Sequence, residues 1–95
     1  MAAYVIGEIE VTDPKAYEEY RRQVDAVNAK YGGRFLARGG KVEILEGGDS
    51  PKRMVVLEFP SMAQAREWYR SAEYAPLIKL RQKASRGKLI AVEGA

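Results

Sequence analysis

The chain has 95 residues, of which 46% are hydrophobic and 31% charged, and its formal net charge is +3. This length and balance are typical of a globular protein, so residues 1–95 are expected to form a single domain. Neither cysteine nor histidine occurs, which excludes disulfides, thiolate nucleophiles, Ser-His-Asp triads and haem or metal sites ligated by either residue. Any acid–base chemistry must therefore use carboxylates, Tyr, Lys or Arg.

The composition favours neither a membrane nor a nucleic-acid partner. No apolar run approaches the ~20 residues that cross a bilayer, and Glu8 and Glu10 come too early for a signal peptide. We therefore expect a cytoplasmic protein. A solvated helix face explains the most basic stretch more simply than a nucleic-acid stripe does. That stretch comprises Lys79, Arg81, Lys83, Arg86 and Lys88.

The first third of the chain predicts a strand followed by a helix. Residues 3–11 (AYVIGEIEV) are rich in β-formers and alternate two sets of side chains, as a strand does. Asp13 is a natural N-cap, and Pro14 suits the first helical position. Apolar residues then recur at helical spacing, which predicts one buried helix face up to about residue 30. The pair Gly32-Gly33 ends that helix.

Two strand-like segments, 34–38 (RFLAR) and 41–45 (KVEIL), flank the pair Gly39-Gly40. The glycine pair indicates a bulge or bend in one long strand, with a tight hairpin as the alternative. Residues 46–52 predict a loop, because they contain Gly-Gly, Asp and Pro. Residues 53–59 (RMVVLEF) are apolar on both faces, which is typical of a strand covered on both sides.

The last third predicts two helical segments and a final strand. Ser61 and Gln64 form a capping box at the start of a short helix. Residues 71–73 bend the chain, residues 74–84 continue helically, and residues 88–93 (KLIAVE) form the last strand. The order βαββαβ predicts an α+β, ferredoxin-like fold: a four-stranded antiparallel-type sheet with helices on one face. Right-handed crossovers place the first and third strands at its centre.

The apolar pattern of this sheet predicts a homodimer. Helices can cover only one face, yet strand 53–59 is apolar on both sides, and strand 3–11 places Tyr4 and Ile6 on its second face. Soluble monomers usually avoid exposing an apolar face of this kind. Two copies packed about a two-fold axis would bury it and form a dimeric α+β barrel.

Sequence blocks along essentially the whole chain resemble one family. The blocks are, in order, YVIGEIEVTDPKAYEEYR, YGGRFLARGG, EILEGGDSPKR, VVLEFPSMAQAREWYRSAEY and LIAVEGA. They resemble small bacterial proteins labelled only as domain of unknown function number thirteen-thirty. The resemblance implies the dimeric α+β barrel superfamily, whose members include cofactor-free monooxygenases, muconolactone isomerases, haem-handling enzymes and sheet-dimer binding modules. Its haem-degrading members rely on a histidine that this chain lacks, which argues against haem.

The candidate catalytic residues are Glu8 and Glu58. Each shares a predicted strand face with apolar residues, so both carboxylates could point into the dimer interior, where Arg38 could reach them. In the functional interpretation, Arg38 binds a carboxylate or enolate oxygen of a ligand, and Glu58 or Glu8 acts as general base. The alternative is a structural ion pair, or carboxylates that reach water at the mouth of the barrel.

Three aromatic residues, Trp68, Tyr69 and Tyr74, cluster around the predicted bend between the helical segments. They could wall a ligand site for a flat molecule, although such a stripe is more often part of a core. Residues 31–34 (YGGR) could form an anion-binding nest, which a helix C-cap explains more simply. Neither remaining Gly-Gly pair fits a phosphate loop, and no metal-ligand set is recognisable.

Two functions from different classes fit these observations. The first is a homodimer that binds a small acidic or aromatic metabolite. Any conversion of that metabolite would proceed without a cofactor. The second is a non-catalytic interaction or stress-associated module whose charged residues only stabilise the dimer. A ferredoxin-like fold by itself does not choose between them, because unrelated functions share it.

Overall fold

The sheet is organised around strand β1 (Ala3–Val11), whose alternate residues point to opposite faces. The computed structural model of the chain describes residues 1–48, 50 and 52–95. Within them, β2 (Arg34–Arg38), β3 (Arg53–Phe59) and β4 (Ser85–Glu93) complete a four-stranded sheet of order β2-β3-β1-β4. Every neighbouring pair is antiparallel. The predicted central position of the first and third strands is therefore confirmed.

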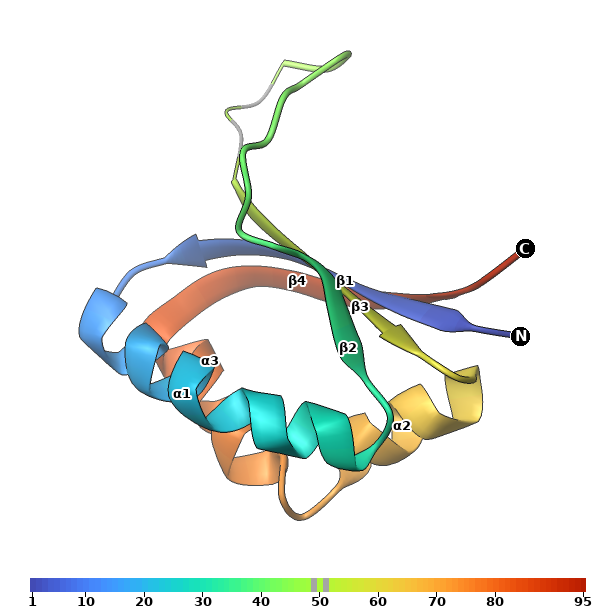
Figure 1. Cartoon of the computed structure of the whole chain (residues 1–95). Coiled ribbons are helices and arrows are strands. Elements are labelled where there is room, and N and C mark those ends of the chain that lie inside the picture. Colours follow the sequence, from blue (N-terminus) through green and yellow to red (C-terminus); the bar gives the residue numbers. More distant parts are fainter. Residues whose placement is uncertain (49, 51) are drawn as a thin grey trace.

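Three helices in the described part of the chain cover one face of this sheet (Figure 1). They are α1 (Pro14–Lys30), α2 (Met62–Arg70) and α3 (Ala75–Ala84). The Asp13 carboxylate accepts from the backbone N–H of Ala16 at 3.2 Å, and the Ser61 hydroxyl oxygen accepts from that of Gln64 at 3.1 Å. Both predicted N-caps are confirmed, since each satisfies a backbone donor that a helix start leaves free.

The glycines after α1 form a helix C-cap. The N–H groups of Gly32 and Gly33 donate to the carbonyl oxygens of Ala29 and Asn28 at 3.1 and 2.8 Å. Gly32 has a φ of +80°, in the left-handed region that glycine adopts most readily. Because these N–H groups are already used at the helix end, the nest interpretation of residues 31–34 is not needed.

Aromatic side chains fill the space between the helices and the sheet. Trp68, Tyr74 and Phe59 are among the largest fully buried side chains. The ring of Trp68 stacks on that of Tyr74 with centroids 4.3 Å apart, and it packs 5.0 Å from the ring of Phe59. Aromatic rings bury large apolar areas, so this cluster holds α2, the turn before α3 and β3 against one another.

The opposite face of the sheet, the outer face, is not covered by a helix of the described chain (Figure 1). Ile90 and Val92 on this face of β4 pair with Ile6 and Tyr4 of β1 and are 51% and 46% exposed. This is the apolar face from which the sequence predicts a homodimer. Among the described residues, no helix is both long and apolar enough to span a membrane.

The strand predicted at residues 41–45 is not formed. The last ladder contact before this segment is the Gly39 N–H, which donates to the carbonyl oxygen of Met54 at 2.8 Å. The chain then projects away from the sheet (Figure 1). A strand needs a neighbour for its backbone hydrogen bonds, and the described chain offers none here. Residues 49 and 51 of the predicted 46–52 loop lie outside the described residues.

Two further strand details differ from the prediction. The register of β2 against β3 shifts between Phe35 and Ala37, so a bulge lies ahead of the Gly39-Gly40 pair. Strand β4 begins at Ser85 rather than at Lys88, because its pairing with β1 continues to the end of that strand. The first difference changes the face on which the end of β2 presents its side chains.

Replacing Gly87 with alanine should destabilise the fold by about 2 kcal/mol or more. Gly87 has a φ of +147°, and a Cβ there would collide with the backbone carbonyl of Glu8 on the neighbouring strand. Chemical denaturation of Gly87→Ala and of the control Gly48→Ala measures the effect. A Cβ at Gly48 meets no atom within 4 Å, so that control should match the wild type. Equal stabilities of the two variants would contradict the proposed clash.

Candidate functional site

A groove runs between the edge strand β4 and the helices α2 and α3. Its α2 end is a cavity of about 220 Å³ with a largely apolar lining that includes Trp68. Its α3 end is a cavity of about 260 Å³ that includes Arg81. Tyr69 and Leu89 line both cavities, which are therefore neighbours. The two together are called the β4 groove below.

Helix and strand periodicity place the groove residues. Arg66 and Arg70 lie one helical turn apart and follow one stripe of α2, and Tyr69 projects from the neighbouring stripe. On β4, Leu89 points toward the helices and pairs with Gly7 of β1. A Cβ at Gly7 would lie 3.0 Å from the Leu89 side chain, so the glycine leaves room for this leucine.

The charged residues that line the β4 groove within the described residues are all basic, although Arg86 and Lys88 pair with Glu10 and Glu8 of β1 and so direct their side chains to the outer face. They are Arg66 and Arg70 at the α2 end, and Arg81, Arg86 and Lys88 at the α3 end. Of these, Arg86 is paired through Nε with Glu10 at 3.1 Å. Clustered cations over an apolar floor raise the local concentration of anions that carry an apolar body. No group of three or more His, Cys, Asp or Glu side chains that could hold a metal occurs within the described ranges.

Two buried phenols lie behind the α3 end of the groove. The hydroxyl oxygens of Tyr20 and Tyr74 are 2.8 Å apart and share a hydrogen bond. Burial raises the pKa of both phenols above the ordinary tyrosine value, and for Tyr74 this outweighs the lowering effect of Arg81. Burial acts to lower the pKa of Arg81, but the facing phenols outweigh it and the net change is upward. The site thus holds neutral hydroxyls beside a permanent cation.

A second, smaller cavity of about 20 Å³ lies between the sheet and the helices and is called the inner cavity below. Four guanidinium groups line it, those of Arg21, Arg38, Arg53 and Arg81. The buried Nε–H groups of three of them, all except Arg38, have no hydrogen-bond partner within the described residues, and neither does the indole N–H of Trp68. Buried donors without acceptors are unfavourable and uncommon. This concentration of donors makes the cavity suited to one small acceptor, such as a water molecule.

The structure brings together the three aromatic residues predicted to bind a ligand. Tyr69 meets Trp68 and Tyr74 edge-on, with ring centroids 6.2 and 6.1 Å away. Trp68 and Tyr74 are each 1% exposed, whereas Tyr69 is 41% exposed. Trp68 and Tyr74 are therefore core residues, while Trp68 and Tyr69 also line the groove. Their role in binding a ligand stays a prediction.

Arg38 does not reach the predicted carboxylates, and that part of the prediction is wrong. The bulge between Phe35 and Ala37 reverses the alternation of β2, so Arg38 lies opposite Val55 on the helix face. Its guanidinium forms an ion pair with Asp25 of α1 at 2.9 Å. Without the bulge, the side chain would lie on the outer face. Arg38 lines the small inner cavity instead, and its role in ligand binding stays a prediction.

Glu8 and Glu58 lie on the outer face, but they are not close partners. They occupy opposite ends of the β1–β3 pairing. Glu58 forms an ion pair with Arg34 at 2.7 Å, and Glu8 lies 3.7 Å from the ammonium of Lys52. Neither carboxylate lines the β4 groove. Their predicted role as general bases therefore concerns the space between two sheets, and it stays a prediction.

The basic residues of the groove are the ones that sequence reasoning missed. It leaves Arg66 and Arg70 unassigned and places Arg81 on a solvated helix face. One signal could have identified Arg81: it follows Tyr74 by seven residues and Leu77 by four, and this spacing puts all three on one side of a helix. Arg66 and Arg70 show no comparable signal, because facing β4 depends on the tertiary fold.

Comparison with known protein families gives one match. The model of a family described as a domain of unknown function (DUF1330) matches residues 2–95. The resemblance inferred from the sequence blocks is thereby confirmed. None of the curated proteins matches the chain.

Several solved structures share the fold. A protein of unknown function from Rhodopseudomonas palustris has a TM-score of 0.80 at 21% identity, over 99% of this chain and 82% of that one. SnoaB, a cofactor-independent oxygenase from Streptomyces nogalater, has a TM-score of 0.69 at 14% identity, over 99% and 93%. A dimeric ferredoxin-like protein of unknown function from Jannaschia sp. CCS1 has a TM-score of 0.69 at 14% identity, over 100% and 99%. These similarities confirm the predicted ferredoxin-like α+β class.

The buried phenols predict a loss of stability at alkaline pH. Because the folded state raises the pKa of Tyr20 and Tyr74, the stabilisation is complete below the unfolded pKa of ~10 and falls as pH rises further. The loss should approach about 1.4 kcal/mol per phenol for each pH unit above that value. Unfolding in urea at pH 9 and pH 11 measures it, with Tyr20→Phe/Tyr74→Phe as the comparison. An equal pH dependence in both proteins would contradict the shifts.

Proposed function

We propose that this chain, which belongs to the DUF1330 family of unknown function, is a homodimer that binds a small anionic aromatic metabolite in the β4 groove. One observation carries the proposal: the groove combines an apolar, aromatic floor with basic side chains and no carboxylate from the described residues. Small-molecule sites typically pair an apolar lining with a few polar groups that fix orientation. Here those polar groups are all suited to an anion.

The dimensions of the groove limit the size of this ligand. The two cavities measure about 220 and 260 Å³, each below the ~300 Å³ of common ligand pockets. A compound of one or two rings therefore fits best. Its ring would lie against the exposed Tyr69, and its acidic group would meet Arg66 and Arg70, or Arg81 at the other end.

The α3 end also offers groups for a conversion without a cofactor. Arg81 would stabilise a carboxylate or enolate oxygen through charge and hydrogen bonding. The solved neighbour named as a cofactor-independent oxygenase supports chemistry of this general type. Arg38 would take part only if the groups around the inner cavity moved apart, because its volume of about 20 Å³ admits no more than a water-sized group. Glu8 and Glu58 would act as bases only for a ligand held between the two sheets.

The dimer of this proposal packs outer face on outer face. Ile90 and Val92 are about half exposed on that face, and burial of such apolar surface drives association. A homodimer joined through identical patches also needs no second gene product. The solved neighbour described as a dimeric ferredoxin-like protein supports a dimer.

Binding of a fluorescent probe tests the groove. The probe is 8-anilinonaphthalene-1-sulfonate, an anionic aromatic dye, and its uncharged analogue N-phenyl-1-naphthylamine reports apolar contact alone. We expect Arg66→Gln/Arg70→Gln to weaken binding of the anionic dye by about tenfold, or ~1.4 kcal/mol, and to leave the neutral dye nearly unchanged. Fluorescence titration gives both dissociation constants.

The matched control for this experiment is Arg22→Gln. Arg22 lies on α1, is exposed and pairs with Glu19, so removal of its charge should not affect either dye. If Arg22→Gln weakened binding of the anionic dye as much as Arg66→Gln/Arg70→Gln does, the net charge of the protein alone would explain the binding. Undiminished binding of the anionic dye by the groove variant would remove the metabolite site and favour the non-catalytic module.

The substitution Val56→Asp tests the sheet-to-sheet dimer. Val56 pairs with Ile6 at the centre of the outer face, where a carboxylate could not be desolvated without a partner. We expect a dimer for the wild type and a folded monomer for Val56→Asp by light scattering after size exclusion. Ala63→Asp on the helix side, at an exposed position of α2, should remain dimeric. A dimer that tolerates Val56→Asp would contradict this interface.

A further inference from the structure

The β4 groove carries positive charge at both of its ends. Arg66 and Arg70 line the α2 end, and Arg81 lines the α3 end. Arg86 and Lys88 do not add to this charge, because their side chains point to the outer face. Within the described residues, none of the three groove arginines forms an ion pair with a carboxylate. Each end therefore keeps its charge available for an anion.

The two basic ends lie at opposite ends of one stretch of β4. Helix α3 passes directly into β4, and the Ser85 hydroxyl donates to the carbonyl oxygen of Arg81 at 2.6 Å. Arg81 therefore lies where the strand begins. The α2 cavity, with Arg66 and Arg70, extends instead to Ala91. Six residue steps of ~3.4 Å separate Ser85 from Ala91, which makes this stretch of strand about 20 Å long.

The middle of the groove is apolar. Tyr69 and Leu89 line both cavities, and they approach from opposite sides, Tyr69 from α2 and Leu89 from β4. The ring of Tyr69 meets the buried rings of Trp68 and Tyr74 edge-on, which holds it in place. An aromatic ring packs well against another ring or against an aliphatic side chain. A flat ring of a ligand therefore fits between Tyr69 and Leu89.

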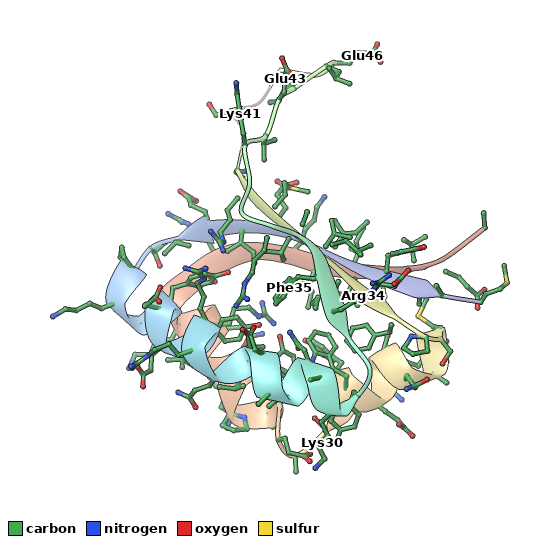
Figure 2. The ribbon with its side chains drawn as sticks, in the orientation of Figure 1. Lys30, Arg34, Phe35, Lys41, Glu43 and Glu46 are labelled. Carbon is green, nitrogen blue, oxygen red and sulfur yellow. The ribbon has the colours of Figure 1, made fainter. Side chains whose placement is uncertain are left out.

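No carboxylate of the described residues lines either cavity of the groove. Glu43 and Glu46 project beyond the sheet on the side away from the helices (Figure 2). Glu8 and Glu10 of β1 lie on the outer face, opposite Lys88 and Arg86 of β4. The groove therefore presents a basic end, an apolar middle and a second basic end.

We propose that the β4 groove binds an aromatic diacid, a molecule with one or two flat rings and an acidic group at each end. The inference rests on the proposed function and names the ligand class of that same site. One acidic group would meet Arg66 and Arg70. The rings would lie between Tyr69 and Leu89, and the second acidic group would meet Arg81.

A diacid uses the groove more fully than a ligand with one acidic group does. A monoacid would leave one basic end without a partner. When both acidic groups belong to one molecule, binding of the first holds the second close to its own site, which raises the affinity without a new kind of contact. The two cavities are neighbours of about 220 and 260 Å³, so a single molecule can occupy both.

The two ends should hold their acidic groups with different sensitivity to salt. Arg66 and Arg70 are exposed, and salt screens exposed charges strongly. Arg81 is partly buried, and the amide of Gln82 beside it can donate a further hydrogen bond. The acidic group at the α3 end would therefore be held more firmly than the group at the α2 end.

Biphenyl-4,4′-dicarboxylate and its monomethyl ester test the ligand class. The two compounds share the same rings and nearly the same length, but the ester has only one charged end. We expect the wild-type protein to bind the diacid about tenfold more tightly than the ester, as measured by isothermal titration calorimetry. Equal dissociation constants, or no binding of either compound, would overturn the diacid as the ligand class.

Variants at each end locate the two acidic groups. Arg66→Gln/Arg70→Gln should bind the diacid and the ester equally, because only one basic end remains. Arg81→Gln should do the same, and circular dichroism checks that it is folded. The control Arg22→Gln, on the exposed side of α1, should keep the preference for the diacid. A preference that persists in either folded groove variant would overturn the placement at that end. If Arg81→Gln does not fold, the wild-type comparison and the α2 variant decide.

Failure of this inference is distinguishable from failure of the proposed function. The dye 8-anilinonaphthalene-1-sulfonate has a single acidic group, and its dependence on Arg66 and Arg70 tests the groove for any aromatic anion. Dye binding that requires these arginines, together with equal binding of the diacid and the ester, would keep the anion site and overturn the diacid. Dye binding that ignores the arginines would overturn both.

Discussion

All three helices of the described chain lie on one face of a single sheet, and most other features depend on this one-sided cover. The helix face encloses the aromatic core, whereas the outer face keeps apolar side chains such as Ile90 and Val92 accessible. The helices also meet the sheet unevenly at the β4 edge, where the surface opens as a groove. One arrangement thus creates both the need for a second copy and the opening for a ligand.

The stack of Trp68 on Tyr74 links the core to the groove. Trp68 lies in the C-terminal part of α2, and Tyr74 immediately precedes α3. Their contact therefore fixes the angle between the two helices. That angle directs Tyr69 toward β4 and brings Arg81 beside the buried phenols. Core packing is dense and deforms little, so groups mounted on this stack hold their geometry. The groove is therefore preorganised by hydrophobic contacts rather than by its own polar groups.

Features governed by local chemistry could be predicted from the sequence, and features governed by partners could not. The caps at Asp13 and Ser61 need only one side chain and a nearby backbone, and both occur as predicted. The side of the sheet on which Arg38 lies depends on a bulge in the pairing of β2 with β3. No residue of β2 indicates this bulge in the sequence. The basic lining of the groove likewise depends on which side of α2 packs against β4. The segment 41–45 has a strand sequence, but its structure depends on what lies beside it.

The concentration of arginine around the helix–sheet space is hard to explain by stability alone. Four guanidiniums line one small cavity, while the ion pairs within the described residues engage Arg21 with Glu18 and Arg38 with Asp25. Like charges repel, and buried donors without acceptors are unfavourable. Substitution of these arginines by apolar residues would therefore remove both the repulsion and the unpaired donors. Natural sequences break such local rules mainly at functional sites. This unfavourable arrangement is therefore itself an argument that the small cavity between the helices and the sheet holds a hydrogen-bond acceptor, for which its volume of about 20 Å³ leaves room for one water-sized group.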